Sequence, residues 1–157
     1  MLNWTYDASG SNLREGNLKL TGSDGWKNIS THKIDGTGKL YYEFVNTSAG
    51  GWQLLGILVV TKGNLKNPSN ALTDSRIYGF ASTQATYFGG SYTSTSDVPG
   101  WSNNHVMGVK YEKGILRLYK DGTLATATAT GIDQTKEIYA YIACLLYTSD
   151  AADESVR

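Results

Sequence analysis

Two alternating runs of residues joined by an Asp-Gly pair are the feature that most constrains the fold of this chain. In the segment ILRLYKDGTLATAT, apolar and polar side chains alternate on both sides of Asp121 and Gly122. Alternation with a period of two is typical of a half-buried strand, and an Asp-Gly pair supplies the positive φ angles of a two-residue hairpin turn. The segment therefore predicts an antiparallel hairpin formed by residues 115–120 and 123–130.

The residues before this hairpin predict further strands of two kinds. In HVMGVKYEKGIL, Gly114 stands at a position that readily turns left-handed, which predicts a second hairpin. In residues 40–45, LYYEFV, every second side chain is expected on the same packed face, which predicts a half-buried strand. Residues 54–60 are nearly all apolar, which predicts a central strand covered on both faces. Gly56 inside that strand indicates a bulge or a close backbone approach.

The chain as a whole predicts one all-β domain of about ten short strands. It is 157 residues long and contains 18 Gly and 11 Tyr, and its helix-forming residues never recur at helical spacing. The expected strands are residues 17–21, 26–31, 39–46, 52–60, 77–81, 85–88, 105–111, 115–120, 123–130 and 137–143. Short strands at this spacing predict an antiparallel sandwich or barrel.

Three stretches lack apolar alternation and are expected to be loops. They are residues 47–51, 61–76 and 89–104, of which the second contains Pro68 and the third Pro99. Long loops on a compact β scaffold often carry binding residues.

Charge and composition argue against several classes of function. The chain has 14 basic and 14 acidic residues, so no basic face for nucleic acid is expected. Neither a signal peptide nor a transmembrane segment is recognisable, so no membrane insertion is expected and the localisation stays open. Cys144 is the only cysteine, and His32 and His105 stand alone, so we expect no disulfide, no metal site and no cofactor.

The last residues of the chain look foreign to the domain. Residues 144–154 read CLLYTSDAADE, which resembles a translated sequencing adapter read through into the coding frame. We therefore expect a domain over residues 1–143, truncated before its last strand in a metagenomic assembly, and a non-native tail over residues 144–157. The alternative is that residues 145–147 complete a natural strand before a short acidic tail.

The order of motifs from about residue 4 to residue 143 resembles a SPRY domain of the compact type seen in bacteriophage and bacterial proteins. The resemblance rests on GKLYYE at 38–43, YG at 78–79, HVMGVKY, ILRLYKDG and EIYAYIACL. Asp121 replaces the Asn usual in the hairpin turn, and Ala140 stands where Pro is common. The resemblance implies a bent antiparallel β-sandwich of the concanavalin-like jelly-roll kind, without catalytic machinery.

The resemblance also implies a binding module that recognises a protein or peptide through loops at one end of the sandwich. In phages, similar domains decorate virion or tail-associated proteins, so a host-surface component or glycan is a candidate partner. No binding residues transfer from the family, and we select them from loop chemistry, since Tyr, Trp and Asn suit adaptable recognition. The candidates are Trp52, Tyr87, Tyr92, Asp97, Trp101, Asn103 and Asn104. Inward packing is the alternative for the four aromatic residues.

Two other functions are weighed against protein recognition. A lectin-like carbohydrate site would use Trp101 flanked by Asp97 and Asn103, although no short run of acidic residues resembles a calcium site. A glycoside hydrolase would need a carboxylate pair, for which Glu43 and Glu112 are the only candidates on expected strands. No nucleophile elbow or phosphate-binding loop occurs, so we expect no enzyme.

Overall fold

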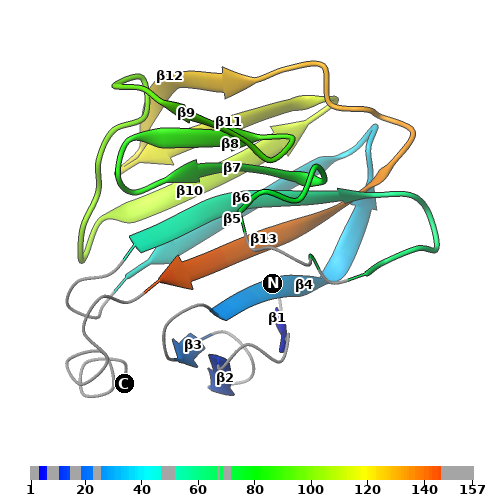
Figure 1. Ribbon diagram of the computed structural model, residues 1–157, viewed down its shortest axis with the longest axis horizontal. Coiled ribbons are helices and arrows are strands. Elements are labelled where there is room, and N and C mark those ends of the chain that lie inside the picture. Colours follow the sequence, from blue (N-terminus) through cyan, green and yellow to red (C-terminus); the bar gives the residue numbers. More distant parts are fainter. Residues whose placement is uncertain are drawn as a thin grey trace.

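The protein is an antiparallel β-sandwich, as the sequence predicts (Figure 1). The computed structural model describes residues 4–6, 11–14, 19–22, 26–46, 52–66, 68 and 72–145. Within these ranges the chain forms thirteen strands and no helix. Two sheets pack face to face, and a separate two-stranded sheet lies beside them.

The strand order differs from the order in sequence. The larger sheet is β1 (Trp4–Tyr6), β4 (Trp26–Asp35), β13 (Glu137–Leu145), β6 (Trp52–Val60), β7 (Ile77–Ala81), β8 (Ala85–Phe88) and β9 (Ser91–Ser94). The smaller sheet is β12 (Thr123–Ala129), β11 (Ile115–Lys120), β10 (Val106–Glu112) and β5 (Lys39–Val45), while β2 (Ser11–Arg14) pairs with β3 (Lys19–Gly22). Because β13 lies between β4 and β6, the middle of the larger sheet joins segments far apart in the sequence.

Several strands differ from the prediction. Strand β9 lies inside the stretch expected to be a loop at 89–104, which corrects that prediction. Its sequence, SYTS, is fully exposed, and among the described strands it pairs with β8 alone, so no apolar alternation marks it. The strands β1 and β2 were likewise not predicted. Strand β13 continues to Leu145, two residues beyond the predicted end, because sheet pairing uses main-chain groups that every residue provides.

The middle of the larger sheet is buried on both faces. Between the two sheets lies one core cluster, to which Leu55 and Ile57 contribute, and on the opposite face of the larger sheet lies a second cluster with Leu54 and Leu58. All nine residues of β6 are buried, which confirms the prediction of a central strand. In β5, buried residues alternate with exposed ones, as expected for a strand with one packed face.

Both predicted hairpins are confirmed by their backbone angles. Asp121 and Gly122 have φ angles of 48° and 83°, and Lys113 and Gly114 have the same two values. The predicted close approach at Gly56 is also present, because a Cβ at this position would collide with the main chain of β7.

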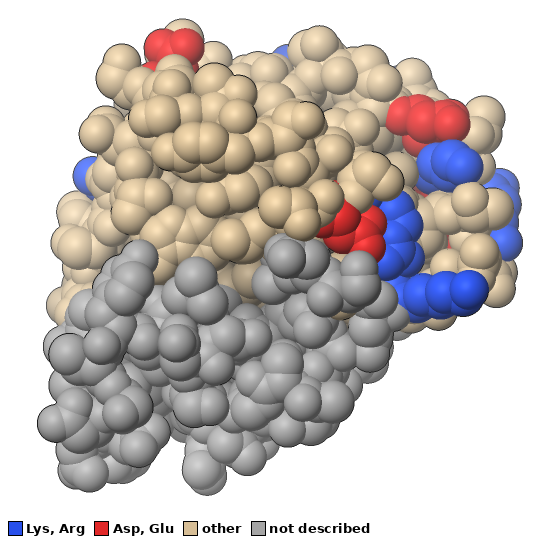
Figure 2. All heavy atoms as spheres, in the orientation of Figure 1, with Lys and Arg blue, Asp and Glu red and all other residues tan. Residues whose placement is uncertain are grey.

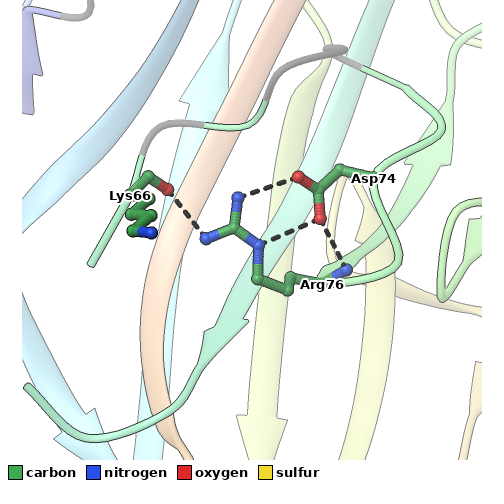
Figure 3. Close-up of polar contacts among 3 residues, drawn as sticks. All are labelled: Lys66, Asp74 and Arg76. Carbon is green, nitrogen blue, oxygen red and sulfur yellow. Dashed lines mark hydrogen bonds and ion pairs between the residues drawn. The ribbon is translucent and has the colours of Figure 1, made fainter. Parts of the chain in front are cut away.

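The connection between β6 and β7 is held by a charged side chain (Figure 3). The Arg76 guanidinium bonds both carboxylate oxygens of Asp74, with Nε 3.0 Å from Oδ1 and Nη2 2.8 Å from Oδ2. Its Nη1 donates a hydrogen bond to the carbonyl oxygen of Lys66 at 2.8 Å. A planar guanidinium can serve several acceptors at once, so Arg76 ties the first part of this connection to its last residues.

Strand connections alternate between two ends of the sandwich, because every pairing is antiparallel. The loop end, which lies at the left of Figure 1, comprises Asn46, the turn 82–84, the connection 95–105 and the turn 121–122. The opposite end carries, among others, the connections 61–76 and 130–136. All seven residues predicted to bind a partner lie at the loop end or on the strands that lead to it.

Candidate functional site

The two tryptophans among the predicted binding residues are buried. Trp52 and Trp101 are 5% and 7% exposed, and each belongs to one of the two core clusters. The Nε1 of Trp52 donates to Oγ1 of Thr83 at 2.9 Å, and the Nε1 of Trp101 donates to Oε1 of Gln53 at 2.8 Å. Both tryptophans therefore pack inward. Trp101 does not form the exposed platform expected for a lectin-like site.

The two tyrosines form a row of aromatic rings with Trp52. The ring centroids of Trp52 and Tyr87 lie 5.9 Å apart in an edge contact, and those of Tyr87 and Tyr92 lie 5.4 Å apart at a tilt of 57°. Such offset and edge arrangements are the favourable ones for aromatic pairs. Tyr92 is 62% exposed, so the row runs from the interior at β6 to solvent at β9.

The two asparagines hold the long loop in place. Asn46, just after β5, donates from Nδ2 to Oδ1 of Asn103 at 3.1 Å, and its carbonyl oxygen accepts the backbone N–H of Asn104 at 2.8 Å. Asn104 has a φ of 68°, a conformation that Asn tolerates better than most residues. Both residues thus fasten the connection 95–105 to the end of the smaller sheet.

Asp97 lines a groove at the loop end. The groove has a volume of about 430 Å³ and lies between the connection before β10 and the β11–β12 hairpin; its lining residues are Ser96, Asp97, Pro99, Lys120, Asp121, Thr123, Leu124, Ala125 and Thr126. The backbone N–H of Ala127 donates to the carbonyl oxygen of Asp97 at 3.1 Å, and Lys120 Nζ donates to the carbonyl oxygen of Gly100 at 2.7 Å. These bonds set the distance between the two walls.

The hairpin wall of this groove was not predicted as a site. Leu124 is 51% exposed although it is a large apolar residue, and it follows the turn directly. The signal in the sequence is its outward position in the alternation of TLATATA. In the sequence, Asp121 and Gly122 are recognisable as turn residues only.

The rim of the groove holds an ionised carboxylate. Asp121 Oδ2 lies 2.8 Å from Nδ1 of His105, and Oδ1 accepts the backbone N–H of Val106 at 2.8 Å. The hydrogen bond from His105, with that from the backbone of Val106, lowers the pKa of Asp121. With Asp97 and Lys120 beside it, the groove offers both signs of charge next to an apolar contact.

The carboxylates considered for glycoside hydrolysis are far apart. Glu112 pairs with Lys39, and the Cα of Lys39 lies about 13 Å from that of Glu43, four residues further along β5. Carboxylate pairs in glycosidases are roughly 5–9.5 Å apart. Glu112 instead lies 3.6 Å from the ammonium of Lys39, and Glu43 accepts a hydrogen bond from Tyr41 at 3.0 Å.

The described residues contain neither a cluster of metal-ligating side chains nor a membrane-spanning helix. Three or more His, Cys, Asp or Glu side chains do not gather anywhere in this part of the chain in a way that could hold a metal ion. In the same part, no helix has the length and apolar character needed to cross a membrane.

The comparisons with known proteins agree on the fold. Neither a protein-family model nor a curated protein sequence matches the chain. The SPRY domain of human HERC1 matches with a TM-score of 0.65 and 16% identity, over 92% of this chain and 91% of that one. The PSpry domain of TRIM65 matches with a TM-score of 0.61 and 13% identity, over 93% and 90%.

A carbohydrate recognition domain also has this fold. That of Emp47p matches with a TM-score of 0.56 and 12% identity, over 98% of this chain and 83% of that one. At such identities the likeness concerns the fold alone, and it confirms the predicted jelly-roll β-sandwich similar to SPRY domains.

Proposed function

We propose that this chain is a non-catalytic binding module that recognises a protein or peptide through the groove at its loop end. The observation that supports this most directly is the exposed Leu124 beside Asp97 and Asp121 in a groove of about 430 Å³. Small-molecule sites in proteins fall in this size range and combine apolar contacts with a few polar groups.

The chemistry of the groove favours a short extended peptide. An apolar side chain of the partner would lie against Leu124, while a basic or amide group would bond the carboxylates of Asp97 and Asp121. The hydroxyls of Thr123 and Thr126 add uncharged hydrogen-bonding groups along the same wall. The likeness to the SPRY domains of HERC1 and TRIM65 supports a binding role for a domain of this shape.

The proposal extends to the setting of the module. A place in a phage or prophage structural or tail protein, with a host-surface component as partner, rests on the resemblance to compact phage SPRY domains. Carbohydrate binding is the second candidate function, and the exposed ring of Tyr92 favours it at a different place on the molecule.

Selection from a displayed peptide library against the full chain tests the groove. The peptides selected should bind Leu124→Ser at least about tenfold more weakly than wild type, because the apolar anchor is lost. Leu65→Ser is the matched control, since Leu65 is also a half-exposed leucine, at 44%, but lies in the connection at the opposite end. If the selected peptides bind Leu124→Ser as tightly as wild type, the groove is not the binding site. If the library yields no binding peptide, the proposal of peptide recognition is wrong.

A further inference from the structure

A continuous part of the chain on the larger sheet carries no charge. From Ile77 to Ser96 the sequence contains no Asp, Glu, Lys, Arg or His, and this segment forms β7, β8, β9 and the turns between them. Figure 2 shows the corresponding area over these strands as a broad surface without Lys, Arg, Asp or Glu. This segment ends in the edge strand β9, and edge strands usually carry charges that protect against self-pairing.

The exposed ring on this face has a rigid support. Tyr92 on β9 stands directly opposite Tyr87 on β8 in the strand register, so both side chains lie on the same face. Tyr87 in turn lies opposite Gly79, and its ring contacts Trp52 edge to face. Tyr92 therefore rests on a partly buried tyrosine that a buried tryptophan holds, and little conformational freedom remains to be lost when a ligand binds it.

Tyr92 shares its face of β9 with a second exposed polar side chain. Ser94 lies on this face two residues further along the strand. All four residues of β9 are exposed. The face thus combines an exposed aromatic ring with uncharged hydroxyl groups.

These properties select a class of ligand. An anionic or cationic ligand would give up hydration without gaining an ion pair here, and a purely apolar partner would leave the hydroxyls unpaired. A neutral sugar ring suits both features, because one side presents C–H groups, which the negative face of an aromatic ring attracts, and its edge presents hydroxyls. We infer that the face formed by Tyr87, Tyr92 and Ser94 binds an uncharged saccharide. This site shares no residue with the peptide groove or with the Trp101 site expected for a lectin.

The first experiment is a screen of the full chain against an array of neutral and anionic glycans. We expect neutral glycans to be retained and anionic ones to be retained less. Titration of the best neutral glycan should then show binding that Tyr92→Ser weakens by about tenfold or more, whereas Tyr92→Phe, which keeps the ring, stays within about twofold of wild type.

Two controls make the result specific. Leu124→Ser should bind the glycan like wild type, which separates this site from the peptide groove. Tyr92→Ser should give an unchanged circular dichroism spectrum, since the side chain is 62% exposed. The inference is overturned if no neutral glycan binds, if only anionic glycans bind, or if Tyr92→Ser binds as wild type does. It is also overturned if the wild type is a dimer that Tyr92→Ser converts to a monomer without glycan binding, because the face would then join two copies through β9.

Discussion

Trp101 and Gln53 form a buried hydrogen bond that joins the long loop to the central strand β6. The Nε1 of Trp101 lies 2.8 Å from Oε1 of Gln53, and the two residues are 7% and 2% exposed. A buried indole N–H needs an acceptor, and Gln53 is one of the few buried polar residues in the described part of the chain. The pair explains why an aromatic residue of a loop belongs to the core.

Replacing Gln53 with leucine should destabilise the protein. The change keeps the volume roughly constant but leaves the N–H of Trp101 buried without its acceptor, which costs about 1–3 kcal/mol in the free energy of unfolding. Urea denaturation followed by tryptophan fluorescence measures the loss. If Trp101→Phe is combined with Gln53→Leu, the double variant should lose less than the sum of the two single changes, since the lost bond is counted once. Strict additivity would mean that the pair contributes nothing.

Removing one hydroxyl between the sheets should also lower stability. The Oη of Tyr42, on β5, lies 2.8 Å from the carbonyl oxygen of Gly56 and 3.2 Å from that of Tyr141, both in the larger sheet. Burial raises the pKa of Tyr42 above its usual value of 10, so the hydroxyl keeps its proton and remains a donor. We expect Tyr42→Phe to cost about 1–2 kcal/mol in the free energy of unfolding, measured by thermal or urea denaturation.

Tyr41 provides the control on the same strand. It is 52% exposed, and its hydroxyl donates to Glu43 at the surface. Tyr41→Phe should therefore change the free energy of unfolding by no more than about 0.5 kcal/mol. Equal losses in the two variants would show that the bond between the sheets has no special weight.

Glu137 should make the stability fall in acid. Its Oε2 lies 2.8 Å from Nζ of Lys33, and its Oε1 accepts the backbone N–H of Gly63. The bond with Lys33 holds the pKa of Glu137 below its usual value of 4.5 in spite of burial. A carboxyl with a lowered pKa in the folded state contributes stability that is present above the unfolded value and lost as the pH falls through the folded one.

Denaturation of wild type and Glu137→Gln across pH 2–7 checks this prediction. The wild type should exceed the variant in stability by a constant amount above about pH 5, and the difference should shrink as the pH drops below 4.5. A difference that does not vary with pH would show that Glu137 acts through packing alone.

Local patterns account for the parts of the fold that the sequence predicted. The Asp121-Gly122 hairpin depends on φ angles that few residue pairs adopt, and the burial of β6 follows from its unbroken apolar run. Strand β9 escaped prediction because its partner supplies the pairing and none of its side chains is buried. Such a strand forms because the neighbouring strand offers main-chain hydrogen bonds, which its own sequence does not indicate.

The candidate binding residues were likewise predictable from the sequence only in part. The sequence predicts binding residues at the loop end and at the tyrosines of β8 and β9, because aromatic residues among Ser, Thr and Asn suit binding surfaces, and this stays a prediction. It could not tell that Trp101 packs inward while Tyr92 stays exposed, since both follow similar polar stretches. It also missed the groove at Leu124, whose second wall comes from residues far away along the chain.

The sequence by itself determined the strands with an apolar pattern, the two hairpin turns and the all-β class, because these depend on alternation and on backbone angles that neighbouring residues set. The tertiary structure alone decided which aromatic rings become core and which face solvent. That choice depends on what the opposite sheet and the distant strand β13 place against each ring, and a side chain is buried only where those segments cover it.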